Sequence, residues 1–449
     1  MSIKACFPRT LQTPALAFAL LMLSAPIARA AIDPAQAAFI FKQARAICSR
    51  DAGALWGQTL CGPMLLVDPD DLTVVANVAD AGGLLTRSGA VFVGHLPPSV
   101  TVSDTTVLWS GTRWCELIWP WPMRLDPDMR EVTLAHEMFH RIQEDLHIER
   151  LDGDNRHLDT LDGRYLMLLE WRALAAALQA KTPENGRIAI ADAILFRRQR
   201  YRIFPDAEAN ETALESNEGV AEYTGVRLGL TTPEARTLYA IRDLSAYTEV
   251  PSLVRSFAYA TGPAYGLLMD EVSPAWRSDF AGHQLAQGFD RRLGAALHLA
   301  PSDFDQLKVR EAVYDGDGAL LAHEIERDQA RQARLAEYQA RLVDGAVLTL
   351  PLAKSNFEFQ PQSLVPLGDQ GTVYPTMRLT DVWGTLTMKS GGVLIRKQAK
   401  IATLSAIGFD GVSGKGPGFE LVLKPGWTMV PGPRKGDLAL QRIEKVVPQ

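Results

Sequence analysis

The chain has few cysteines and no long hydrophobic run beyond its N-terminal segment. Only four of its 449 residues are cysteines, and none of them has the spacing of a zinc-binding cysteine cluster. After residue 30, no segment contains the roughly 20 uninterrupted apolar residues that a membrane-spanning helix needs. The sequence therefore argues against a membrane-embedded protein and a cysteine-based zinc domain, and we expect no stable membrane anchor.

The chain also lacks the positive charge of a nucleic-acid-binding protein. Its formal net charge is -6. If residues 1–30 are removed, the loss of Lys4, Arg9 and Arg29 changes this charge from -6 to -9. Proteins that bind nucleic acid neutralise phosphates with lysine and arginine, so we expect no nucleic-acid partner.

Residues 1–30 have the pattern of a secretory signal peptide. A basic start precedes an apolar stretch at Ala15–Leu23, and Ala28-Arg29-Ala30 provides a cleavage site between small residues. Cleavage before Ala31 leaves no cysteine for a lipid anchor. We therefore expect a periplasmic or secreted protein.

Three cysteines remain after such cleavage. Cys48 and Cys61 are close in sequence and flank a Gly-containing turn region, so a disulfide between them is plausible in an oxidising compartment. Cys115 lies on a probable strand and is expected to be a buried thiol. Because the count is odd, other pairings stay open.

Residues 136–140 read H-E-M-F-H, an H-E-x-x-H motif. Two histidines four residues apart lie one turn apart on one helical face, near enough to bind a single Zn²⁺. Glu137 then lies at the edge of the metal, where it can take a proton from water. The alternative interpretation is a buried histidine pair on an amphipathic helix.

The flanking residues predict a helix around this motif. Asp126-Pro127 is a strong start signal, with a capping side chain followed by proline at the first helical position. The segment 132–142 is mostly apolar, which indicates burial. Buried histidines need polar partners, and a metal would supply one.

A catalytic zinc site needs a third protein ligand. The H-E-x-x-H-x-x-G-x-x-H pattern of metzincins is excluded, because Gln143 and Leu146 occupy its glycine and third-histidine positions. Glu144 follows on the same helix, and a single straight helix cannot place three ligands around one tetrahedral ion. The better candidate is Glu218, in the N-E-G-V-A-E-Y segment at 217–223 of a predicted helix over Glu211–Leu228.

An H-E-x-x-H motif followed by a helix with N-E-G-x-A-x-Y resembles the gluzincins, the thermolysin-like zinc peptidases, and most of all their aminopeptidase and peptidase MA-like branches. The resemblance implies that His136 and His140 are metal ligands, that Glu137 is the general base and that Glu218 is the third ligand. It also implies that Glu222 supports a ligand histidine.

The Y-A-T-G segment at 259–262 is similar to the Y-x-K-G segment of the aminopeptidase branch. By this resemblance the hydroxyl of Tyr259 would stabilise the oxyanion, although Thr261 replaces the lysine. Tyr265 is a competing candidate for the same role.

The chain also departs from the gluzincin pattern. Seventy-seven residues separate His140 from Glu218, more than in thermolysin or the aminopeptidases, and there is no G-x-M-E-N element. The long insert includes a predicted helix over Tyr165–Leu178. Glu170 in this helix is the main rival third ligand, so the sequence leaves both glutamates open.

The pattern along the chain predicts an α+β protein with a small N-terminal sheet, a mostly helical zinc-metallopeptidase core and a C-terminal all-β domain. The expected divisions are a signal peptide at 1–30, an N-terminal β-rich subdomain at 31–125, a helical catalytic region at 126–344 and a β domain at 345–449. The strands expected before the motif are Met64–Val67, Thr73–Ala76, Ala90–Val93, Thr106–Trp109 and Trp114–Trp119. The last predicted helix covers Ala319–Leu342.

Together these observations predict an exported zinc-dependent peptidase that acts on a peptide or protein substrate. Two alternatives stay open. One is a non-enzymatic envelope protein that keeps a metallopeptidase fold for binding, and the other is a zinc hydrolase of a non-peptide amide.

Overall fold

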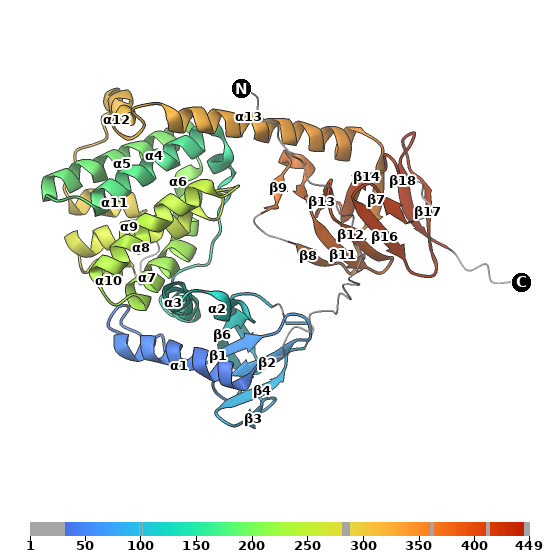
Figure 1. The fold of residues 1–449 in the computed structure, drawn as a ribbon, viewed down its shortest axis with the longest axis horizontal. Helices are drawn as coiled ribbons and strands as arrows, with labels where there is room; N and C mark the ends of the chain where they lie inside the picture. The colour runs from blue at the N-terminus through green and yellow to red at the C-terminus, as the bar shows by residue number, and fades with distance from the viewer. Residues whose placement is uncertain are drawn as a thin grey trace, which may run out of the picture.

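The computed structural model describes residues 32–97, 99–100, 102–280, 288–359, 363–409 and 414–443. Helices occupy the middle of the chain, and β-sheets lie toward its two ends (Figure 1). This confirms the predicted mixture of helices and sheets, while the expected signal peptide lies outside the described residues. Within those residues, no helix has the length and apolar character needed to cross a membrane.

The N-terminal region is a six-stranded sheet with strand order β3-β4-β2-β1-β6-β5. β1 runs parallel to β6, and the other neighbours are antiparallel. Cys115 and Leu117 of β6 join the main core with α1 and α3, whereas Trp114 joins a second cluster on the opposite face. The elements are α1 (Pro34–Asp51), β1 (Met64–Val67), β2 (Thr73–Ala76), β3 (Thr86–Ser88), β4 (Val91–His95), β5 (Thr105–Trp109) and β6 (Thr112–Ile118).

A disulfide joins Cys48 near the end of α1 to Cys61 just before β1, with their Cα atoms 5.1 Å apart. The third described cysteine, Cys115, is a free buried thiol on β6. Both sequence predictions about these cysteines are confirmed.

The helical region begins after the sheet. The side chain of Asp126 caps α3 by accepting a hydrogen bond from the Met129 amide, as the Asp-Pro signal predicts. In Figure 1, α3 is seen nearly end-on between the sheet and the other helices. The helices are α2 (Trp121–Arg124), α3 (Pro127–Gln143), η1 (Arg156–Asp159), α4 (Leu161–Leu178), α5 (Pro183–Ile203), α6 (Ala207–Leu214), η2 (Glu215–Gly219), α7 (Val220–Gly229), α8 (Pro233–Ala246), η3 (Tyr247–Glu249), α9 (Phe257–Val272), α10 (Trp276–Phe280), α11 (Phe289–Ala296), η4 (Phe304–Gln306), α12 (Leu307–Tyr314), α13 (Ala319–Gln339) and η5 (Ala340–Asp344).

The stretch 211–228 is helical, as predicted, and a π-helical turn lies within it. α6 ends at Leu214, η2 (Glu215–Gly219) is π-helical, and α7 follows. Arg197 of α5 holds Glu215 at the start of this turn with two N–H···O bonds of 2.6 and 2.9 Å. Short π segments often occur at functional sites, and this one contains Glu218.

Glycines bring the helices around η2 into backbone contact. A Cβ atom added at Gly225 of α7 would lie 2.7 Å from the carbonyl oxygen of Val132 on α3, and one at Gly229 would lie 2.6 Å from the Val132 amide nitrogen. On the other side, a Cβ atom at Gly262 of α9 would lie 2.1 Å from the carbonyl oxygen of Gly219. The glycine in the N-E-G segment therefore permits a close helix contact.

The C-terminal region contains two sheets, a seven-stranded sheet in the order β17-β18-β7-β14-β13-β10-β9 and a five-stranded sheet in the order β15-β16-β12-β11-β8. Leu348 of the first sheet and Leu379 of the second belong to one hydrophobic core. The elements are β7 (Val347–Pro351), β8 (Asn356–Phe359), β9 (Val365–Pro366), η7 (Gly368–Gln370), β10 (Thr372–Tyr374), β11 (Met377–Asp381), β12 (Gly384–Met388), β13 (Val393–Arg396), β14 (Ile401–Ser405), β15 (Lys415–Gly416), β16 (Phe419–Leu423), β17 (Trp427–Pro431) and β18 (Leu438–Arg442).

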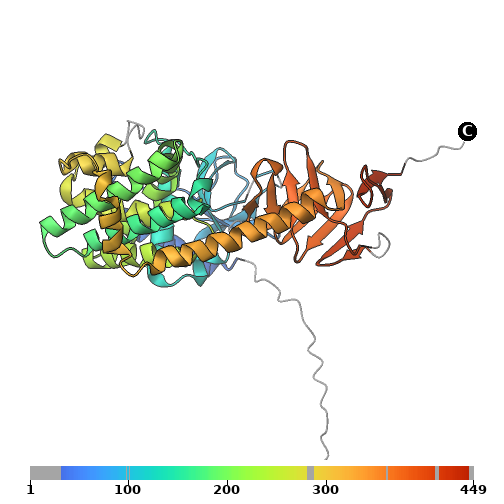
Figure 2. The ribbon, with the colours of Figure 1, turned by 90° about the horizontal axis from the view of Figure 1, so that it is seen from above.

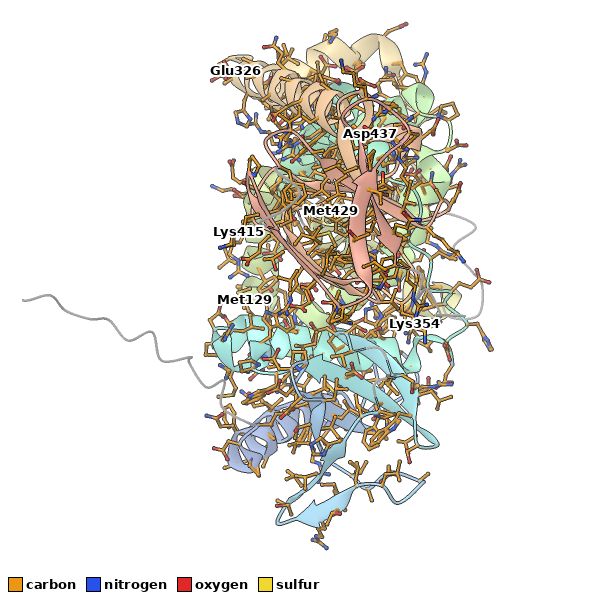
Figure 3. All side chains as sticks on the ribbon, turned by 90° about the vertical axis from the view of Figure 1, so that its right-hand side faces the viewer. Met129, Glu326, Lys354, Lys415, Met429 and Asp437 are labelled. Carbon is orange, nitrogen blue, oxygen red and sulfur yellow. A yellow bond between two sulfur atoms is a disulfide. The ribbon has the colours of Figure 1, made fainter. Side chains whose placement is uncertain are left out.

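The long helix α13 joins the helical region to these sheets (Figures 1 and 2). In the view onto the right-hand side of Figure 1, Glu326 of α13 appears above Met429 of β17 (Figure 3). The predicted helix Ala319–Leu342 is regular only to Gln339, after which η5 continues as a π-helical turn.

We predict that Gly262→Ala destabilises the fold by about 1–3 kcal/mol, the usual cost of overpacking, because its new methyl group would meet the Gly219 carbonyl. Urea unfolding measures this change. Gly294→Ala in α11 is the matched control, since the nearest atom to its Cβ is Ile194 Cδ1 at 3.5 Å, and alanine favours helix more than glycine does. Equal stabilities of the two variants would contradict the close contact between α9 and η2.

Candidate metal centre

Three buried side chains converge from α3 and η2. His136 Nε2 and His140 Nε2 are 3.0 Å apart, and the Glu218 Oε2 atom lies 3.5 Å from the first and 3.7 Å from the second. Bonds of about 2.1 Å to a tetrahedral ion place neighbouring ligand atoms roughly 3.4 Å apart. This buried group could therefore hold a metal ion.

The other nitrogen of each histidine is already occupied. His136 Nδ1 lies 2.7 Å from a carboxylate oxygen of Glu222, one turn after Glu218, and His140 Nδ1 lies 2.7 Å from Gln143 Oε1. Because both partners are acceptors, each Nδ1 carries the proton and each Nε2 presents a lone pair. Two lone pairs facing each other at 3.0 Å repel, so a proton or a cation must lie between them.

Gln143 and Asn217 connect the two sides of the site. The Gln143 amide nitrogen donates to Asn217 Oδ1 at 3.1 Å, and the Asn217 amide nitrogen donates to Glu218 Oε1 at 3.3 Å. This chain of amides runs from His140 to Glu218. Sequence reasoning assigned neither amide a role, although Gln143 lies one helical turn after His140 and Asn217 directly precedes Glu218.

The carboxylates of the site lie in very different electrostatic environments. Burial alone would raise the pKa of Glu218, but its contacts with the imidazoles of His136 and His140 hold it well below its usual value. Burial raises the pKa of Glu137 to about 7, with a smaller contribution from Asp104 and Glu218, while the two histidines oppose the shift. Glu218 is thus ionised, and Glu137 can gain or lose a proton near neutral pH.

Glu137 lies beside the three converging side chains. Its Oε1 atom is 4.0 Å from His136 Nε2. Its Oε2 atom is buried and makes no hydrogen bond with any described residue. A buried carboxylate oxygen without a partner is costly, and it is relieved when the oxygen accepts a proton or binds a water molecule.

Tyr259 of α9 completes the site on the side of Glu218. Its hydroxyl donates to Glu218 Oε2 at 2.7 Å, and its ring stacks on His136 with centroids 5.7 Å apart. Burial and the neighbouring Glu218 raise the pKa of Tyr259 well above its usual value, so the hydroxyl keeps its proton and remains a donor.

The structure places Glu170, the rival third ligand, and Tyr265, the rival oxyanion donor, in another cluster. Glu170 of α4 binds Arg197 Nε and Arg200 Nη2, both at 2.8 Å, and accepts the Tyr265 hydroxyl at 2.9 Å. Glu170 is fully buried, and its carboxylate is neutralised by the two arginines. Neither Glu170 nor Tyr265 belongs to the group that could hold the metal. Glu144, the other glutamate considered, is exposed and pairs with Arg113.

Comparisons with known proteins identify no relative. The chain matches no protein-family model, and no match was found among curated proteins or solved structures. The resemblance to gluzincins therefore rests on the motifs and on the geometry of the site.

We predict that Glu218→Gln weakens zinc binding by more than about 100-fold, beyond the 10–100-fold cost of losing a residue that only orients a ligand. Glu170→Gln should lower the stability of the fold, but the folded variant should still bind zinc, because Glu170 contacts arginines instead of the histidines. Competition with a fluorescent chelator measures both affinities. An emptied site in Glu170→Gln, together with a full site in Glu218→Gln, would contradict the ligand set.

Proposed function

We propose that the protein is an exported zinc-dependent peptidase of the gluzincin type. The observation that carries the proposal is the buried His136, His140 and Glu218 group beside an oxygen of Glu137 that has no partner among the described residues. Two imidazoles and one carboxylate form the ligand set of several catalytic zinc sites, which keep a fourth position open. The ligand types favour zinc over calcium or magnesium, since those ions prefer oxygen alone.

A bound zinc ion would polarise the scissile carbonyl and make water a better nucleophile near neutral pH. Glu137 takes the proton of the attacking water and passes it to the leaving amine, a role for which its buried oxygen without a partner among the described residues is available. The single O–H donor of Tyr259, which binds Glu218 Oε2 in this structure, would turn to the developing oxyanion once Glu218 is a metal ligand. Glu222 and Gln143 hold the histidines in one tautomer throughout.

The N-terminal sheet supports a peptide as the substrate. β5 is the edge strand next to β6, and it contacts α3. The guanidinium of Arg150 bridges the two elements, because it donates to the His140 carbonyl and lies 3.5 Å from Thr105 Oγ1 at the start of β5. Exposed edge strands bind extended peptides through backbone hydrogen bonds. This edge therefore suits a peptide better than a small amide.

The Cys48–Cys61 disulfide supports the export part of the proposal. Disulfides persist in oxidising compartments such as the periplasm or the extracellular medium and are rare in the cytosol. The signal-like pattern of residues 1–30 points to the same compartments.

We predict that Glu137→Gln keeps about one zinc ion per chain and loses nearly all peptide hydrolysis, since glutamine cannot accept the proton of water. Metal analysis and a broad peptide library measure the two properties on the same preparation. The control is Glu144→Gln, which changes an exposed glutamate of the segment after α3 and should retain activity. If the wild-type protein binds peptides without cleaving them and Glu137→Gln behaves identically, the binding-protein alternative replaces the peptidase.

A further inference from the structure

The exposed side chain of Arg255 contacts Glu218, the third candidate ligand. Arg255 precedes α9, four residues ahead of Tyr259. Its Nη2 atom is 3.4 Å from Glu218 Oε1, and its Nη1 atom is 3.0 Å from an Asp152 carboxylate oxygen. The side chain is still 54% exposed. A guanidinium has five N–H donors in a rigid fork, so these two contacts leave donors that face solvent beside the site.

A second guanidinium, that of Arg150, contacts the backbone of the candidate ligand His140. Arg150 donates from Nη2 to the His140 carbonyl at 2.5 Å. Its Nε atom is buried and has no partner among the described residues. Burial lowers the pKa of Arg150, while the carboxylates of Glu144, Glu137 and Glu218 oppose that shift, which places this cation within electrostatic reach of the site. The charge of Arg150 therefore partly offsets the negative charge of these glutamates.

The charges of the site determine where a negatively charged group of a substrate can bind. Glu137, Glu218 and Glu222 would repel an anion, so a carboxylate can approach only where cations offset them. Arg255 contacts the carboxylate of Glu218 itself, and one extended residue spans about 3.3–3.6 Å. A carboxylate that reaches Arg255 therefore belongs to a residue next to the bond that is broken.

From this arrangement we infer that Arg255 forms a subsite for a substrate carboxylate adjacent to the scissile bond, while Arg150 adds positive charge near the site. This inference rests on the proposed peptidase function and specifies its substrates. The carboxylate can be the C-terminal one, which makes the enzyme an exopeptidase at that end, or the side chain of an acidic residue. Planar, paired N–H donors match either carboxylate.

Three matched peptides test the subsite: one with a free C-terminal carboxylate, one with a C-terminal amide, and one amide whose terminal residue is aspartate. Calorimetry measures their binding to the zinc-loaded Glu137→Gln protein, in which turnover does not interfere. We expect at least one carboxylate peptide to bind about 10–100-fold more tightly than the neutral amide. The peptide that shows this preference identifies the source of the carboxylate.

Adding Arg255→Gln should remove the preference, and Arg255→Lys should retain part of it. Arg156→Gln is the matched control, because Arg156 is 52% exposed and pairs with Asp154, away from the candidate ligands. Zinc content is measured in every variant. Equal binding of the three peptides, or an equal loss for all three in Arg255→Gln, would overturn the inference and show that Arg255 only supports Glu218.

Wild-type turnover of the same peptides separates this inference from the proposed function. If all three peptides are cleaved with equal kcat/KM, the peptidase function stands and the carboxylate subsite is wrong. If a carboxylate preference in binding appears without any cleavage, the subsite stands and the peptidase function is wrong. Mass spectrometry of the products shows which residue is released.

Discussion

The close approach of α3, α7 and α9 is the constraint on which the site depends. Gly225 and Gly229 allow α7 to contact the backbone of α3 at Val132, and Gly262 allows α9 to contact η2 at Gly219. Only at this separation do the side chains of His136, His140 and Glu218 converge to within metal-binding distance. The helix packing thus determines the chemistry, because ligand geometry tolerates errors of only a few tenths of an ångström.

A buried network of ion pairs supports η2, the π-helical turn that carries Glu218. Arg197 and Arg200 are fully buried and form ion pairs with Glu170, Glu211 and Glu215, and the last of these begins the π-helical turn that carries Glu218. Breaking such a network leaves an uncompensated buried charge, which commonly costs 3–5 kcal/mol. The long segment between the H-E-x-x-H motif and the third candidate ligand therefore contains the charges that hold that ligand in place.

Sequence patterns predicted the elements whose signals are local. The Asp-Pro cap predicted the start of α3, and short apolar runs between turn residues located β1 and β2 with the bounds that the structure has. The π-helical turn at η2 was not predictable, since it depends on the contact between Arg197 and Glu215 across 18 residues. Glu170 and Glu218 could not be separated for the same reason, because only tertiary structure pairs one with arginines and the other with histidines.

All of the proposed chemistry depends on one zinc ion bound by His136, His140 and Glu218. Anomalous diffraction from crystals of the mature protein, recorded above and below the zinc absorption edge, locates such an ion. We expect one anomalous peak bounded by two imidazole nitrogens and one carboxylate oxygen, at about 2.0–2.2 Å from each. A structure grown with excess zinc that shows no peak among these three side chains would contradict it.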